Sequence, residues 1–115
     1  MKLIVAVIQP TRLRAVQQAL HHIGVTRMTV SDAQGFARQR GQGETYRGAE
    51  YQTNLLRKVA LEIAVSEDFV EPTIECLTQA ARSVPGGAIG DGKIFVMPLE
   101  ETIQLSDGQS GAGSI

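Results

Sequence analysis

Cysteine is almost absent from this sequence, and tryptophan is absent altogether. The lone thiol, Cys76, cannot form an intramolecular disulfide, and no residue spacing around it suggests a metal site. It falls within an apolar helical pattern, which favours packing in the interior over reactivity. The sequence therefore shows no disulfide framework, and we expect no permanently bound cofactor.

Long apolar runs and an excess of one charge are also lacking. No run approaches the 18 residues that a membrane-spanning helix needs, so we expect no membrane insertion. The apolar start turns polar at Gln9 and Pro10, too early for a signal peptide, which makes the cytoplasm the expected location. Eleven Lys and Arg residues are balanced by twelve Asp and Glu residues. Because the basic residues are not concentrated in one run, no nucleic-acid partner is expected.

The sequence does contain enough apolar residues for one packed domain. Of its 115 residues, 43% are hydrophobic and 20% are charged, so we expect a single domain over residues 1–115. Short apolar or β-branched runs predict strands, and apolar residues at helical spacing predict helices. The predicted strands are 3–8, 25–33, 59–65 and 94–97, and the predicted helices are 11–23 and 68–81.

Local signals mark the ends of these elements. Gly24 follows the apolar stripe of the first helix and is a typical C-terminal stop. Asp68 is predicted to cap the second helix, with Glu71 three residues later as in a capping box and Pro72 in the first turn. The tail, residues 106–115, is rich in Gly and Ser and is expected to be mobile.

The predicted order, βαββαβ, is that of the ferredoxin-like motif. Two helices would cover one face of a four-stranded antiparallel α+β sheet. The other face also carries apolar residues, for which a second copy of the chain is the simplest cover. The sequence therefore gives a physical reason for a homo-oligomer.

One connection is far longer than this fold requires. Residues 37–55 join two strands that should pair, although hairpin loops usually have two to five residues. The segment mixes charged, aromatic and glycine residues, as expected of a projecting segment that meets a partner. We interpret it as either functional or disordered.

A glycine-rich segment, residues 85–93, lies between the second helix and the last strand. Glycines let backbone N–H groups approach an anion, and Lys93 adds a positive charge. The Walker spacing is missing, so both a connecting turn and a phosphate site remain open.

Few other residues suggest chemistry. Glu62, on the third strand, is either a solvated strand residue or a hydrogen-bond acceptor for a ligand. The helix dipole explains His21 and His22 more simply than metal binding does. No Ser/His/Asp set and no paired carboxylates with an evident base stand out, so an enzyme is not expected.

Three segments in this order resemble the PII family of nitrogen-regulatory signal proteins. Residues 35–41 (GFARQRG) resemble the entry to the family's T-loop, and residues 46–51 (YRGAEY) resemble its signature around the modifiable tyrosine. Residues 89–96 (IGDGKIFV) resemble the end of its B-loop and the start of its last strand. The similarity runs from residue 1 to about 103, and it implies a ferredoxin-like homotrimer, a T-loop at about 37–55 and a B-loop at about 83–92.

The resemblance also implies ligands and partners. Family members bind ATP or ADP between subunits, bind 2-oxoglutarate with ATP through Mg²⁺, and control a transporter or a metabolic enzyme through the T-loop. By position, Gln39 would bind the magnesium, Lys58 would pair with 2-oxoglutarate, and Tyr51 would be nucleotidylated. The implied nucleotide-binding residues are Thr29, Gly35, Phe36, Arg38, Glu62, Gly90, Asp91, Gly92 and Lys93.

Three positions depart from the family pattern. Ala88, Gln104 and Ser106 stand where the family has basic residues that face the phosphates. Each charge-assisted hydrogen bond contributes about 1.5–3 kcal/mol, so their loss predicts weakened ATP binding. ADP and AMP would be affected less than ATP.

Two hypotheses follow for the function. In the first, a PII-like regulator senses adenine nucleotides, and 2-oxoglutarate as a further candidate effector. In the second, a trimer of the same fold has lost ATP and 2-oxoglutarate sensing and binds another small ligand, a metal or a membrane transporter. A titration with the three adenine nucleotides would separate the two.

Overall fold

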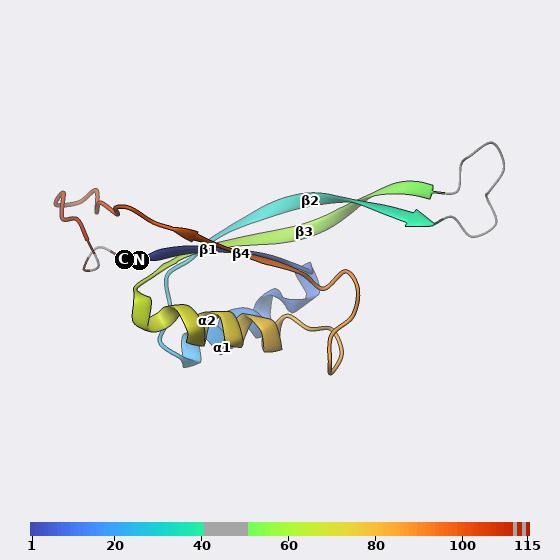
Figure 1. Ribbon diagram of the computed structural model, residues 1–115, viewed down its shortest axis with the longest axis horizontal. Coiled ribbons are helices and arrows are strands. Elements are labelled where there is room, and N and C mark those ends of the chain that lie inside the picture. Colours follow the sequence, from blue (N-terminus) through green and yellow to red (C-terminus); the bar gives the residue numbers. More distant parts are fainter. Residues whose placement is uncertain (41–50, 112, 114) are drawn as a thin grey trace.

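The computed structural model describes residues 1–40, 51–111, 113 and 115, and the side chains at 35–40 and 51–55 lie outside this description. The chain alternates strands and helices in the predicted order (Figure 1). Its elements are β1 (Lys2–Ile8), the 3₁₀ turn η1 (Pro10–Arg12), α1 (Leu13–His22), β2 (Thr29–Arg40), β3 (Tyr51–Val65), α2 (Glu67–Ala80) and β4 (Gly92–Pro98).

The four strands form one antiparallel sheet in the order β2-β3-β1-β4. Both helices lie on the same side of this sheet (Figure 1). This arrangement confirms the predicted ferredoxin-like fold. Because β2 and β4 occupy the two edges, the loop before β4 and the start of β2 belong to opposite edges of the sheet.

The core lies between the sheet and the helices. Along β1, Ile4, Ala6 and Ile8 are buried, whereas the residues between them are only half-buried. The same alternation runs along β3, as predicted, because successive strand side chains point to opposite faces. The buried side chains of β3 and of the two helices are Val59, Leu61, Ile63, Val65, Val16, Leu20, Thr73 and Leu77.

The first helix ends at His22, one residue before the predicted end, and Gly24 follows its C-cap residue Ile23 as the predicted stop. This glycine has a φ of 90°, and its N–H donates to the carbonyl of His21. The N–H of Val25 donates to the carbonyl of Leu20, which completes a Schellman motif. The predicted strand at 25–33 therefore begins too early, because Val25 belongs to the helix end and pairing with β3 starts only at Thr29.

The predicted N-cap of the second helix is wrong by two residues. Helix α2 begins at Glu67, and Ser66 is its N-cap, without a side-chain hydrogen bond. Asp68 therefore lies in the first turn instead of capping it, and Pro72 stands inside the helix. The acidic residues Glu67 and Asp68 still favour this position, because negative side chains are stabilised near a helix N-terminus.

The two ends of the predicted long connection, residues 37–40 and 51–55, belong to a two-stranded ribbon. Twelve residue pairs join β2 to β3, from Thr29 with Glu62 to Arg40 with Tyr51. Only the first four pairs fall where β3 also pairs with β1, so the other eight project beyond the sheet (Figure 1). Residues 41–50, the remainder of the predicted T-loop, lie outside the described residues.

The sheet face opposite the helices keeps apolar side chains exposed. Phe95 and Met97 on β4 are 49% and 39% exposed, and Val5 and Leu3, their register partners on β1, are half-buried. This open face is where a second copy of the chain was expected. No helix in the described parts of the chain has the length and apolar character to cross a membrane.

Candidate functional site

The loop at residues 83–92, named here loop 83–92, is held in shape by its own aspartate. The Asp91 carboxylate accepts a hydrogen bond of 2.7 Å from the Ser83 hydroxyl and one of 2.8 Å from the Ala88 N–H. These bonds lower the pKa of the Asp91 carboxyl, with the Ser83 bond the larger cause. Since both oxygens are engaged within the loop, Asp91 is suited to shaping the loop and not to contacting phosphates.

Two side chains tie this loop to the rest of the sheet. The Lys58 Nζ donates to the carbonyl oxygen of Gly90 at 2.7 Å, and the Gln9 Nε2 donates to the same oxygen at 3.1 Å. Lys58 comes from the base of the β2–β3 ribbon, and Gln9 directly follows β1. A residue implied to bind 2-oxoglutarate is therefore in direct contact with the loop implied to bind phosphates.

Gly92 allows the loop to enter β4 close to β1. Its φ is 132°, a conformation that side-chain-bearing residues rarely adopt. A Cβ atom at this position would clash with the carbonyl oxygen of Val7. Lys93 is the next residue and pairs with Val7 of β1. Its exposed side chain therefore lies at the start of β4, next to the loop.

Thr29 and Glu62 form a second group of predicted site residues. They are register partners on β2 and β3, so both side chains lie on the same face of the sheet. They line a pocket of about 460 Å³ together with Leu3, Met28 and Ala64. Arg27, Thr102 and Ile115 complete its wall. Glu62 is exposed there and can accept a hydrogen bond from a ligand.

A single chain does not bring these two groups together. Lys58 and Glu62 lie four residues apart on β3, which separates them by about 13 Å at the usual rise per residue. Lys58 contacts loop 83–92, whereas Glu62 lines the pocket of Thr29 at the other end of the sheet. Within one chain, the two groups of predicted residues therefore remain apart.

The remaining predicted residues lie in the ribbon. By backbone register Gly35 faces Leu56, Arg38 faces Thr53, and Gln39 faces Gln52. The predicted modification site, Tyr51, is the first residue of β3, and Phe36 faces Leu55. Their side chains lie outside the described part of the structure.

The C-terminal segment presents neutral groups where the family pattern has arginines. The Gln104 Nε2 donates to the Ser106 hydroxyl oxygen at 2.9 Å, so these two side chains bond to each other. Around them, the backbone closes a turn through hydrogen bonds between Gln104 and Gln109 and between Thr102 and Gly111. The expected mobility of residues 106–115 stays a prediction.

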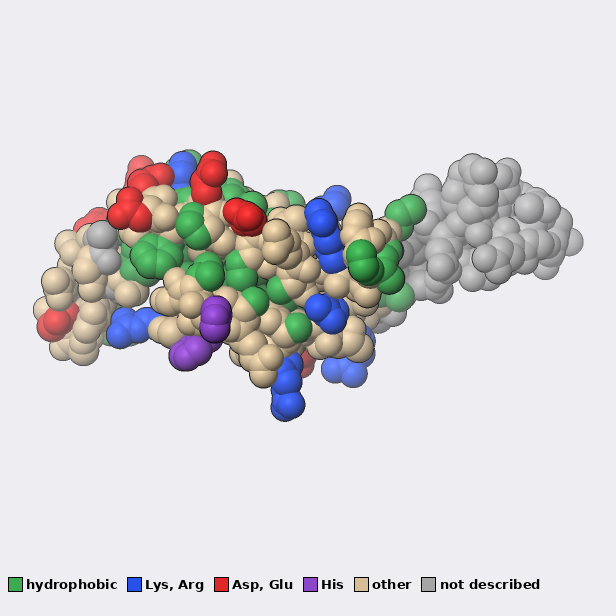
Figure 2. Space-filling model, turned by 90° about the horizontal axis from the view of Figure 1, so that it is seen from below, with side chains coloured by type: hydrophobic (Ala, Val, Ile, Leu, Met, Phe, Trp, Pro, Cys, Tyr) green, Lys and Arg blue, Asp and Glu red, His purple; other side chains and the backbone are tan. Residues whose placement is uncertain are grey.

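Neither histidines nor the cysteine add a metal site in the described residues. No group of three or more His, Cys, Asp and Glu side chains converges there. His21 and His22 are exposed at the end of α1 and appear in purple on the helix layer (Figure 2). Burial raises the pKa of the Cys76 thiol, which keeps it protonated and weakly nucleophilic.

Sequence reasoning missed two residues near these groups. Gln9 holds the Gly90 carbonyl, and Arg27 adds a cation to the pocket of Thr29 and Glu62. Gln9 directly follows a buried strand, where side chains meet the neighbouring loops. That position could have indicated that Gln9 contacts a loop. Arg27 lies in the segment that was assigned to a strand.

Comparison with known proteins places the chain in a family. The family model "Nitrogen regulatory protein P-II" matches residues 1–109. The chain is 46% identical over its whole length to the nitrogen regulatory protein P-II of Azospirillum brasilense, whose whole length is also covered. It is 45% identical to the nitrogen regulatory protein GlnK1 of Methanosarcina mazei, with all of this chain and 97% of the relative covered.

A third relative, the nitrogen regulatory protein GlnK of Escherichia coli, is 40% identical over the full length of both chains. The family consists of regulatory signal-transduction proteins and not of enzymes. The resemblance in the three sequence segments therefore extends to the whole chain. The protein belongs to the PII family of nitrogen regulatory proteins and is a signal-transduction regulator.

Proposed function

We propose that this PII protein senses adenine nucleotides in clefts between the subunits of a cytoplasmic homotrimer. The T-loop region, residues 37–55, would then report occupancy of the clefts to a transporter or a metabolic enzyme. The observation that supports this proposal is the division of the candidate site. Thr29 and Glu62 lie at one end of the open face, and loop 83–92 lies at the other.

A trimer would join the two half-sites. PII proteins form trimers and bind nucleotide effectors. The open sheet face, with Phe95 and Met97 exposed, needs the cover that neighbouring subunits would supply. In the proposed cleft, one subunit contributes Thr29 and Glu62 around the nucleoside. Its neighbour contributes the backbone N–H groups of Gly90–Gly92 and the Lys93 ammonium group to the phosphates, together with Gly35, Phe36 and Arg38.

Lys58 would couple a second effector to the loop. In the described state its ammonium group is bonded to the Gly90 carbonyl. A carboxylate of 2-oxoglutarate would compete for that ammonium group, because a charge-assisted bond is stronger than one to a neutral carbonyl. Binding of the effector would then release loop 83–92 from one of its two anchors and leave Gln9 as the other.

A magnesium ion in this site would be held mainly by its ligands. Mg²⁺ typically uses substrate oxygens, water and one or two protein ligands. This fits the described residues, which contain no acidic or histidine cluster. Gln39 remains the proposed protein ligand, and the ion would link the phosphates to 2-oxoglutarate. Tyr51 remains the proposed nucleotidylation site.

Neutral residues near the phosphates favour nucleotides of lower charge. Gln104 and Ser106 bond to each other, and Ala88 has no polar side chain. Losing two charge-assisted bonds of about 1.5 kcal/mol each would weaken binding about 100-fold. We therefore propose ADP or AMP as the better ligand. The alternative, a trimer that has lost ATP and 2-oxoglutarate sensing and binds another ligand, metal or transporter, rests on the same three positions.

Titration calorimetry with ATP, ADP and AMP, each with Mg²⁺ and with or without 2-oxoglutarate, tests this proposal. We expect ATP to bind more weakly than the family pattern implies, and ADP and AMP to be weakened less. The double variant Gln104→Arg, Ser106→Arg should raise the affinity for ATP more than that for AMP. An equal gain for both would mean that the arginines act through general charge. Absence of binding by all three nucleotides would refute nucleotide sensing and favour the alternative.

A further inference from the structure

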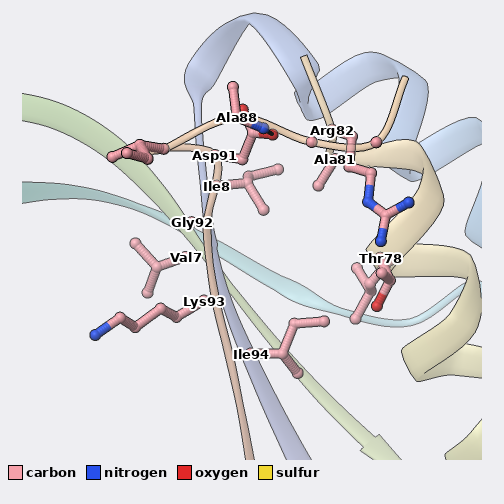
Figure 3. Close-up of a pocket in the computed structure, with 14 residues that line it drawn as sticks. Val7, Ile8, Thr78, Ala81, Arg82, Ala88, Asp91, Gly92, Lys93 and Ile94 are labelled. Carbon is pink, nitrogen blue, oxygen red and sulfur yellow. Dashed lines mark hydrogen bonds between the residues drawn. The ribbon is translucent and has the colours of Figure 1, made fainter. Parts of the chain in front are cut away.

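A groove lies between α2 and loop 83–92 (Figure 3). Its volume is about 540 Å³, within the usual range for small-molecule sites. The last turn of α2 forms one wall, and the loop forms the other. Ile8 and Ile94 lie at its base, on the helix side of the sheet.

The groove shares its loop wall with the candidate nucleotide residues, because Asp91, Gly92 and Lys93 also line it. Neither Lys58 nor Gln9, which hold the loop from the open face, lines it. Thr29 and Glu62 line a different pocket. In Figure 3, Lys93 points away from Thr78 and Arg82, as expected for a strand residue next to Ile94.

Two glycines form the turn in the loop wall of the groove. Gly86 and Gly87 have φ values of 82° and 84°, so the chain turns there in a conformation that other residues rarely adopt. A Cβ atom at Gly87 would lie 3.6 Å from the Nε of Arg82 and 3.7 Å from its Cδ. The loop backbone therefore runs along the stem of Arg82.

Arg82 is the feature that suggests a ligand. Its side chain extends into the groove in the direction of Thr78 (Figure 3). Within the described residues, no hydrogen bond or ion pair engages its guanidinium group. The acidic residue that lines the groove, Asp91, already accepts bonds from Ser83 and Ala88. The groove thus combines an unpaired cation with an apolar base.

We propose that this groove binds a small organic carboxylate with an apolar body. The carboxylate would accept two parallel hydrogen bonds from the Arg82 guanidinium group, a geometry that a planar guanidinium fork favours. The apolar body would lie against Ile8, Ile94 and Ala81. Because the groove shares Gly92 and Lys93 with the proposed phosphate site, a bound carboxylate would act on loop 83–92 from the helix side of the sheet.

The test is an amide-spectrum titration of the full chain with sodium hexanoate. We expect shifts confined to residues 78–82 and 86–94, with a dissociation constant on the order of 1 mM. Hexan-1-ol and hexylamine, which keep the chain and lack the carboxylate, should bind at least about tenfold more weakly. Equal binding of either control compound would overturn the proposal, as would the absence of shifts in the groove at about 10 mM hexanoate.

Variants of Arg82 distinguish hydrogen bonding by its guanidinium group from a general attraction to positive charge. Arg82→Gln should weaken hexanoate binding at least about tenfold, and Arg82→Lys should weaken it less because one bond remains. Arg14→Gln, on the exposed face of α1 and outside the groove, is the matched control and should change nothing. Unchanged affinity in Arg82→Gln would overturn the proposal. Displacement of hexanoate by ATP or AMP would assign its carboxylate to the phosphate-binding residues of the loop and overturn the proposal.

Discussion

Replacing Thr73 by valine should stabilise the protein. Thr73 is fully buried in α2, and its hydroxyl oxygen has no hydrogen-bond partner within the described structure. Leaving a buried hydroxyl unpaired destabilises the folded state by about 1–3 kcal/mol. Valine has nearly the same volume and the same β-branching, so the exchange removes the unpaired group without a cavity or a loss of helix propensity.

We expect Thr73→Val to raise the free energy of unfolding by about 1–2 kcal/mol. For a chain of this size, 1 kcal/mol corresponds to a rise in Tm of roughly 3–6 °C. Thermal unfolding followed by circular dichroism measures the shift, at matched protein concentration because assembly makes Tm depend on concentration.

Thr78→Val is the matched control on the same helix. The Thr78 hydroxyl donates to the carbonyl of Ile74 at 2.7 Å, so its removal eliminates an existing hydrogen bond. This variant should leave Tm unchanged or lower it slightly. A fall in Tm for Thr73→Val would refute the reasoning, because it would show that the Thr73 hydroxyl is paired in the folded protein.

Three further predictions concern assembly, pH and the loop. Light scattering at micromolar concentration should give about three times the chain mass of 12.4 kDa, and a stable monomer would contradict the inter-subunit cleft. Because hydrogen bonds depress the folded pKa of Asp91, the order of loop 83–92 should be complete above the ordinary value of 3.8 and be lost as the pH falls further. Hydrogen exchange at the Ala88 amide should show this, and exchange in Asp91→Asn should be fast already at neutral pH. Gly92→Ala should destabilise the protein by more than about 1 kcal/mol in denaturant unfolding, because its Cβ would meet the Val7 carbonyl; an unchanged midpoint would contradict that contact.

Much of the fold could be predicted from local patterns. The apolar run at 3–8 and the alternation at 59–65 identified two central strands, because burial on one face imposes a period of two. Gly24 marked the end of α1 correctly, since its left-handed conformation is a local requirement. The ribbon of β2 and β3 escaped prediction, because backbone pairing between polar residues leaves no hydrophobic period. The start of α2 was misplaced because Asp68, two residues after the actual N-cap Ser66, forms the capping-box pattern with Glu71.

The candidate site, like the fold, could be predicted from the sequence only in part. The sequence by itself indicated the glycine-rich loop, the residues that the PII resemblance implies, and the missing cations at Ala88, Gln104 and Ser106, because residue identity determines charge and backbone freedom.

Which residues meet depends on the tertiary structure. It brings Lys58 and Gln9 to the Gly90 carbonyl, separates Glu62 from that loop, and leaves Arg82 without a partner among the described residues, in a groove on the helix side. These contacts join residues tens of positions apart, and sequence spacing does not encode distances across a sheet.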